Sequence, residues 1–158
     1  MMTTADLGDL LAPEAVLADV AAGNKRALFA ALGAAAARVW SLDEGVVAAA
    51  LAAREKLGTT GFGGGVAVPH ARIEGLDAVR GVFVRLPRAI EFDAVDSLPV
   101  DLVFMMLSPP EAGADHLKAL ARVSRRLRDR AFAEKLRGAG SRDALYALLT
   151  AAETRDAA

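Results

Sequence analysis

The stretch that most constrains the fold is Val100–Leu107, which reads VDLVFMML and is almost continuously apolar over the length of one β-strand. Such a strand is typical of the centre of a sheet, where both faces are covered by other elements. A Ser-Pro-Pro sequence at residues 108–110 follows it and should end it, because proline lacks an N–H and has a fixed φ. Within the strand, Met105 and Met106 are interpreted as core residues and not as ligands.

Four other stretches have the apolar spacing of helices that pack one face on a core. They run from the N-cap Asn24 to about Trp40, from Ser41 to before Gly58, from near Asp115 through Arg130, and after the N-cap Ser141. Ser41 and Glu44 have the S-x-x-E spacing of a capping box, which predicts where the second helix begins. The inward residues expected in the third helix are Leu117, Leu120, Val123 and Leu127.

Shorter stretches have the pattern of strands. They are residues 15–20, Val66–Val68, Arg80–Leu86 and the neighbourhood of Ile90 and Phe92. The second of these ends at Pro69, so His70 should emerge at a strand end. Because Arg80–Leu86 reads RGVFVRL and alternates polar with apolar residues, it predicts a half-buried strand.

Helical and strand patterns interleave along the chain, which predicts an α/β fold. We expect a single-domain sandwich with a mixed β-sheet of about five strands and helices on both faces. The domain should span residues 1–158, with a core at about 10–150 and frayed termini.

Composition excludes several classes of function. The chain has no cysteine, which rules out disulfides and cysteine metal sites, and its net charge of −1 argues against nucleic-acid binding. No uncharged apolar run reaches the roughly 18 residues of a membrane helix, so we expect no direct membrane insertion. The acidic amino terminus differs from a basic secretory signal, which favours a soluble cytoplasmic protein. The two histidines are a poor metal signature, and no metal or cofactor is expected.

Residues 54–72 read REKLGTTGFGGGVAVPHAR and carry the strongest functional signal. Glycine has no Cβ, so backbone N–H groups in such a run can converge on a small anion. The candidate phosphate-binding residues here are Thr59, Thr60, Gly63, Gly64 and Gly65. The run matches neither G-x-G-x-x-G nor a Walker loop, so a bare phosphoryl group is favoured over a whole nucleotide. The alternative is a flexible loop beside an exposed histidine.

Three charged or titratable side chains, those of Arg54, His70 and His116, could share one site. Arg54 lies on the inward stripe of its helix, where a guanidinium is costly unless an anion or carboxylate meets it; alternatively, it offsets the negative helix end. His116 lies in the first turn of a helix, where free N–H groups favour an anion; alternatively, it faces solvent.

Residues 117–137 carry eight lysines and arginines against two acids, which indicates a solvated face or a docking surface for an acidic partner.

If Arg54, His70 and His116 converge, each has a distinct task. One ring nitrogen of His70 would be a nucleophile while its other N–H is held by an acceptor. Arg54 and His116 would supply donors to a transferring phosphoryl group. A serine or threonine triad is disfavoured because no G-x-S-x-G elbow occurs. A non-catalytic interaction module remains an alternative.

The glycine-to-VPH passage, paired with GADHLKALARVSRRLRD at residues 113–129, resembles the IIA component of the fructose/mannitol class of the sugar phosphotransferase system. The intervening IEFDAVDSLPVDLVFMML and the stand-alone length are similar to its nitrogen-regulatory branch. The resemblance covers about Leu10 to Leu149. Ala71 stands where many relatives have glycine, and Gly64 where some have histidine.

The resemblance implies a phosphoryl carrier, a transferase-class protein charged at Nε2 of His70 by a small histidine phosphocarrier protein. It also implies that Arg54 and His116 are phosphate partners. In the nitrogen branch the phosphorylation state is a signal read by targets such as sensor kinases or potassium transporters. The alternative is the sugar-specific branch, which passes phosphate to a IIB domain.

Overall fold

The computed structural model describes residues 7–151, and these fold around a mixed six-stranded sheet. Its strands are β1 Val16–Leu17, β2 Gly61–Gly63, β3 Val66–Ala67, β4 His70–Arg72, β5 Arg80–Ile90 and β6 Val100–Ser108. The strand order is β1-β5-β6-β3-β2, and β4 also pairs with β6. The strand β6 is antiparallel to β5 and parallel to β3 and β4. The prediction that residues 100–107 form the central strand is confirmed.

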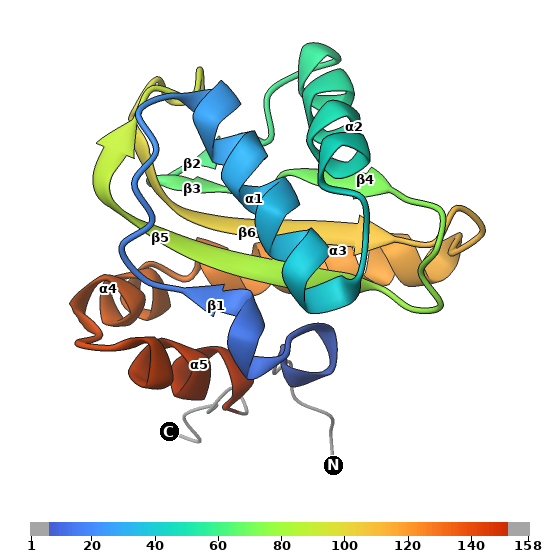
Figure 1. The fold of residues 1–158 in the computed structure, drawn as a ribbon. Helices are drawn as coiled ribbons and strands as arrows, with labels where there is room; N and C mark the ends of the chain where they lie inside the picture. The colour runs from blue at the N-terminus through green and yellow to red at the C-terminus, as the bar shows by residue number, and fades with distance from the viewer. Residues whose placement is uncertain (1–6, 152–158) are drawn as a thin grey trace.

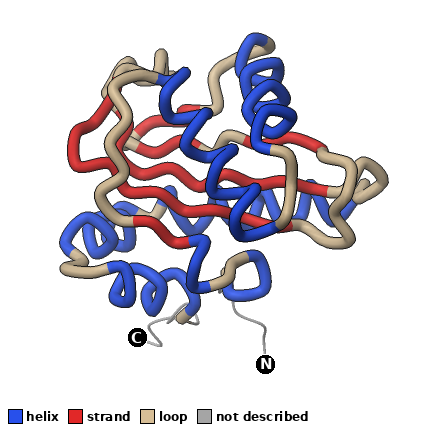
Figure 2. The backbone as a smooth tube through the Cα atoms, in the orientation of Figure 1, coloured by secondary structure: helices blue, strands red, loops and turns tan. Residues whose placement is uncertain are grey.

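Helices cover both faces of this sheet, as predicted. They are α1 Lys25–Trp40, α2 Glu44–Lys56, α3 Ala114–Arg128, α4 Arg130–Gly138 and α5 Arg142–Thr150, after two short 3-10 turns at Gly8–Leu10 and Pro13–Ala15. In Figure 1, α1 and α2 lie over one face of the sheet and α3 lies behind the other. Figure 2 shows the strands as one continuous layer between these helices.

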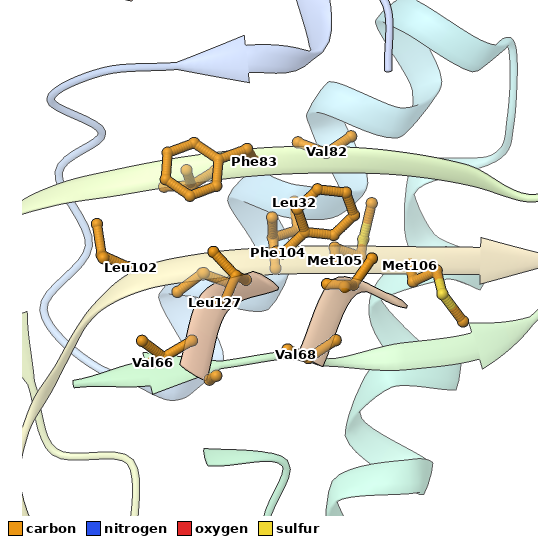
Figure 3. Close-up of a cluster of buried hydrophobic side chains, with 14 of the residues drawn as sticks. Leu32, Val66, Val68, Val82, Phe83, Leu102, Phe104, Met105, Met106 and Leu127 are labelled. Atoms are coloured by element: carbon orange, nitrogen blue, oxygen red, sulfur yellow. The ribbon is translucent and has the colours of Figure 1, made fainter. Parts of the chain in front are cut away.

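The core lies on both sides of β5 and β6. Figure 3 shows Leu32 of α1 and Leu127 of α3 against these strands, together with Phe83 and Phe104. The prediction that β5 is half-buried is wrong, because Val82, Phe83 and Val84 are all fully buried. With helices on both faces, an apolar side chain is buried whichever way it points.

Two of the predicted helix caps are confirmed and one is wrong. The side chains of Asn24 and Ser141 accept hydrogen bonds from Ala27 N–H and Ala144 N–H, at 2.8 and 3.1 Å. Ser41 does not start a capping box, since it has a φ of 59° and ends α1. Asp43 caps α2 instead, accepting from the N–H of Val46. Aspartate satisfies free N–H groups at a helix start as well as serine does.

Other element boundaries also differ from the prediction. The strand β5 continues to Ile90, with a register shift between Arg85 and Ile90, so residues 90–92 form no separate strand. The third predicted helix ends at Arg128, because Asp129 caps a new helix, α4, that the sequence reading missed. The buried face of α3 includes His116 and Ala119, so Leu117, which was predicted to point inward, is 65% exposed.

Within residues 7–151, no helix is both long and apolar enough to cross a membrane. The predicted frayed termini lie outside the described residues, and a single domain over 1–158 stays a prediction.

Candidate functional site

His70 is the first residue of β4, directly after the Val68-Pro69 break in the sheet. Its ring is half-buried, and Nδ1 lies 2.9 Å from the carbonyl oxygen of Val68. A carbonyl oxygen only accepts, so this contact puts the ring proton of the neutral imidazole on Nδ1. Nε2 then carries the free lone pair, which is the arrangement a nucleophilic histidine needs.

The second histidine lies next to the first in space. β4 pairs with β6, with His70 opposite Met106, and the chain leaves β6 through a short turn into α3. The rings of His70 and His116 are 5.6 Å apart between centroids, at an interplanar angle of 54°. His116 is 6% exposed and its Nδ1 lies 2.7 Å from Ser108 Oγ. The alternative of a solvent-facing histidine is therefore wrong.

Arg54 brings a permanent cation to the same place from the last turn of α2, which lies beside β4 in Figure 1. Its Nη1 donates to the carbonyl oxygen of Gly58 at 2.9 Å, just beyond the helix end. Arg54 also lines a pocket of about 480 Å³ with both histidines. The pocket is lined by Ala50, Ala53, Arg54, Leu57, His70, Ala71, Arg72 and His116. Arg54 therefore contacts a carbonyl oxygen just beyond the helix end and also lines the pocket that holds the two histidines.

Arg72 is a second cation in this pocket, and the sequence reading assigned it no role. Residues two apart in a strand point to the same face, so His70 and Arg72 of β4 share one side of the sheet. The guanidinium reaches the carbonyl of Pro110 at 3.4 Å and is otherwise exposed. The sequence His70-Ala71-Arg72 could have indicated this role of Arg72, because in a strand the first and third residues point to the same face.

The pKa values of both histidines are lowered from the ordinary histidine value. Burial lowers the pKa of His70, and the positive charges of Arg54 and Arg72 lower this pKa further, against the opposing effects of the Val68 carbonyl and Glu55. Burial also lowers the pKa of His116, followed by the charges of Arg72 and His70. Because protonation would remove the lone pair at Nε2, a lowered pKa keeps His70 nucleophilic at neutral pH.

The two threonines of the run serve another network. Thr60 donates from its backbone N–H and from Oγ1 to the carboxylate of Glu55, the latter at 2.7 Å. Thr59 Oγ1 donates to the carbonyl of Phe92 at 3.4 Å and accepts from the N–H of Gly61. Neither threonine lines the histidine pocket.

The three consecutive glycines end β2 and form the turn to β3, with φ values of 114°, 68° and 81° at Gly63, Gly64 and Gly65. The N–H of Gly64 donates to Asp96 at 2.9 Å, and its carbonyl accepts from Arg137 of α4 at 2.8 Å. A Cβ on Gly65 would lie 2.5 Å from Nη2 of Arg137. Glycine is needed here for positive φ and close packing on α4, and the turn does not line the pocket.

Among residues 7–151, no group of three or more histidine or carboxylate side chains is placed to hold a metal ion.

Comparison with known proteins adds to this geometry. Residues 9–152 match the family model described as phosphoenolpyruvate-dependent sugar phosphotransferase system, EIIA 2. The chain is 48% identical over 141 residues to a nitrogen regulatory protein of Bradyrhizobium diazoefficiens, covering 89% of this chain and 92% of that one. It is 39% identical over 153 residues to a nitrogen regulatory protein of Escherichia coli, covering 96% and 93%.

The fold also matches a solved structure. The nitrogen regulatory protein IIA-Ntr of Neisseria meningitidis aligns with a TM-score of 0.85 and 36% identity, covering 91% of this chain and 99% of that one.

Proposed function

This chain belongs to the EIIA type-2 family of the phosphoenolpyruvate-dependent sugar phosphotransferase system, and from that premise we propose that it is a cytoplasmic carrier that accepts a phosphoryl group on His70. Its similarity to nitrogen regulatory proteins over nearly the whole chain supports a regulatory IIA. The observation that carries the proposal is the state of His70. Its Nδ1–H donates to the Val68 carbonyl, so Nε2 is the reactive atom.

The proposed step is an in-line transfer between two histidines. Nε2 of His70 forms a bond to the phosphorus while the N–P bond to the donor histidine breaks, and the donor nitrogen keeps the electron pair. The proton on Nδ1 of His70 stays in its hydrogen bond to the Val68 carbonyl oxygen. The phosphorylated ring is then positively charged, and this charge-assisted hydrogen bond stabilises it. Because the transition state is loose, catalysis consists mainly of positioning and charge stabilisation.

The residues around His70 supply that stabilisation in the proposal. The guanidinium groups of Arg54 and Arg72 contribute two positive charges to the pocket, and His116 adds a ring donor from α3. Losing one preorganised donor in such a site costs about 3 kcal/mol. We leave the glycine turn and the two threonines out of the phosphate site, because none of them lines the histidine pocket and because the Gly64 backbone and both threonine hydroxyls already have hydrogen-bond partners in the chain.

The proposed donor is a small histidine phosphocarrier protein, and the surface beside the pocket suits a protein partner. Leu57 at the end of α2 and Leu117 in α3 are 84% and 65% exposed, next to Arg54 and His116 respectively. Leu57 lines the pocket itself and Leu117 follows His116 in the chain, and exposed apolar residues provide contact area for a protein partner. The proposed readers of the phosphorylation state are regulatory proteins such as sensor kinases or potassium transporters.

The test is labelling followed by intact mass measurement. The protein is incubated with phosphoenolpyruvate and the general phosphotransferase proteins, with either the nitrogen-branch or the sugar-branch carrier. We expect one acid-labile phosphoryl group, its loss in His70→Ala, and slower labelling in His116→Ala. Wild-type protein that gains no mass with either carrier would refute the proposal. Rapid onward transfer from His70 to a IIB domain would instead assign the sugar-specific branch.

A regulatory output requires a second measurement. Candidate targets are tested for binding to the phosphorylated protein, the unphosphorylated protein and His70→Ala. We expect affinity for a true target to differ between the first two forms and His70→Ala to behave as the unphosphorylated form. Equal affinity of all three forms would indicate a binding module that does not read phosphorylation.

A further inference from the structure

Ser108, the last residue of β6, is a buried polar side chain to which the proposed transfer gives no role. It has no exposed surface, and its Oγ lies 2.7 Å from Nδ1 of His116. Its backbone is fixed by the sheet, where it pairs with Arg72 of β4 and accepts a hydrogen bond from Ile73 N–H at 2.8 Å. The serine is therefore a rigid point against which the His116 ring is set.

The proton in the contact between Ser108 and His116 can be assigned from the surroundings. A hydroxyl has one donor hydrogen, and within residues 7–151 His116 Nδ1 is the hydrogen-bond partner found for Ser108 Oγ. If Nδ1 carried the ring proton and donated to Oγ, the hydroxyl hydrogen would be left unpaired without access to water. A buried donor without a partner is strongly disfavoured. The favoured arrangement has the hydroxyl donating and Nδ1 accepting.

Building on the proposed function, we propose that Ser108 is a positioning residue that holds neutral His116 in the tautomer with its proton on Nε2. His116 Nε2–H is then a neutral donor toward the group on His70. The partner of one ring nitrogen decides the state of the other. A hydroxyl that donates to Nδ1 stabilises the unprotonated nitrogen.

The two histidines would therefore be set in opposite states by different partners. The Val68 carbonyl accepts from Nδ1 of His70 and leaves a lone pair at Nε2, whereas the Ser108 hydroxyl donates to Nδ1 of His116 and leaves a hydrogen at Nε2. Side by side, with ring centroids 5.6 Å apart, one ring attacks and the other donates. With the other tautomer, a lone pair of His116 would face the phosphoryl oxygens and repel them.

The tautomer is measured directly by ¹⁵N NMR of the side chains of uniformly labelled, unphosphorylated protein, at about pH 8, above the ordinary histidine pKa. Assignment uses His70→Gln, which leaves only the signals of His116. We expect the Nδ1 of His116 to resonate as an unprotonated nitrogen and Nε2 as a protonated one. The reverse pattern, or an even mixture of tautomers, would overturn the proposal.

Substitutions test the role of the hydroxyl. Ser108→Ala removes it, Ser108→Thr keeps it, and Ser124→Ala makes the same chemical change in α3, outside the pocket. In Ser108→Ala we expect the pKa of His116 to rise by roughly half a unit to one unit, since the lost hydrogen bond favoured the neutral ring. A pKa that falls would mean that Nδ1–H donates to the serine, and an unchanged pKa would mean that the hydroxyl does not favour the neutral ring, so either result would overturn the proposal.

The rate of phosphoryl transfer to His70 gives the second readout. We expect about a tenfold loss in Ser108→Ala, smaller than the loss expected for removing the donor itself, and rates near wild type in Ser108→Thr and Ser124→Ala. An unchanged rate in Ser108→Ala, in protein that folds normally, would overturn the positioning role. The NMR measurement needs no phosphoryl donor, so a failure of the proposed function shows in wild-type labelling alone and is distinguishable from a failure of this inference.

Discussion

Arg54 offers the most direct test of the pocket, because its charge faces His70 while its structural contact is small. Among residues 7–151, its side chain donates one hydrogen bond, to the carbonyl of Gly58 at an exposed helix end, and such a contact contributes only about 0.5–1.5 kcal/mol to folding. A preorganised donor at the site of developing charge is worth more, about 10²- to 10³-fold in rate. Arg54→Ala should therefore lose transfer activity far more than stability.

The same substitution should change the titration of His70. The positive charge of Arg54 lowers the pKa of His70, so removing it should raise that pKa. Arg54→Lys keeps the charge but lacks the planar fork that binds two phosphoryl oxygens, so it should leave the pKa close to wild type and recover only part of the rate.

The assay is the initial rate of labelling from the phosphorylated carrier, with the pKa followed by NMR. Arg38→Ala is the matched control, since Arg38 is an exposed arginine in the last turn of α1. A transfer rate for Arg54→Ala within about twofold of the Arg38→Ala rate would refute the reasoning, because a donor on the reacting group is worth far more than that. So would a fall in the pKa of His70.

Three further predictions concern stability and the glycine run. The pKa values of His70 and His116 are both lowered by burial, so the unfolded chain binds more protons and the free energy of unfolding should fall as pH drops below about 6.5; chemical denaturation across that range should show a flatter slope in a variant with both histidines replaced by glutamine. Gly33→Ala should destabilise the protein by about 1–3 kcal/mol, because the new Cβ would lie 2.5 Å from the backbone oxygen of Glu44 at the contact between α1 and α2. Gly138→Ala, also in a helix but with nothing within 4 Å of the new Cβ, should be neutral or slightly stabilising, and equal melting temperatures for these two variants would contradict the packing argument. Gly64→Ala should cost about 1–2 kcal/mol for its φ of 68° and leave the labelling rate of His70 unchanged; a loss of labelling as large as that expected for Arg54→Ala would return the glycine turn to the phosphate site.

Much of the fold could be predicted because the signals are local. The central strand at residues 100–107 is too apolar to lie anywhere except between two layers, and Asn24 and Ser141 satisfy helix N–H groups within three residues. The prediction failed where two local signals competed. Ser41 and Asp43 are both good N-caps, and only the path of the chain between α1 and α2, with Ser41 at a positive φ, selected the aspartate.

The candidate site divides in the same way. The sequence by itself determined which groups are available. They are His70 directly after the strand-ending Pro69, Arg54 in the last turn of a helix, and His116 in the first turn of another. The sequence indicated the glycines as well and assigned them to a phosphate, which stays a prediction, while in the structure the Gly64 N–H donates to Asp96 and the Gly64 carbonyl accepts from Arg137. A glycine run permits close approach of a backbone, and composition does not say what approaches it.

Only the tertiary structure decided which of these groups meet. The pairing of β4 with β6 brings His70 beside the turn that leads to His116, and the contact of α2 with β4 adds Arg54. The sequence also could not predict that Val68 is the hydrogen-bond partner of His70 Nδ1 and that Ser108 is the partner of His116 Nδ1. The physical reason is that ring proton position and pKa depend on burial and on atoms a few ångströms away, and these atoms come from segments that the chain order separates.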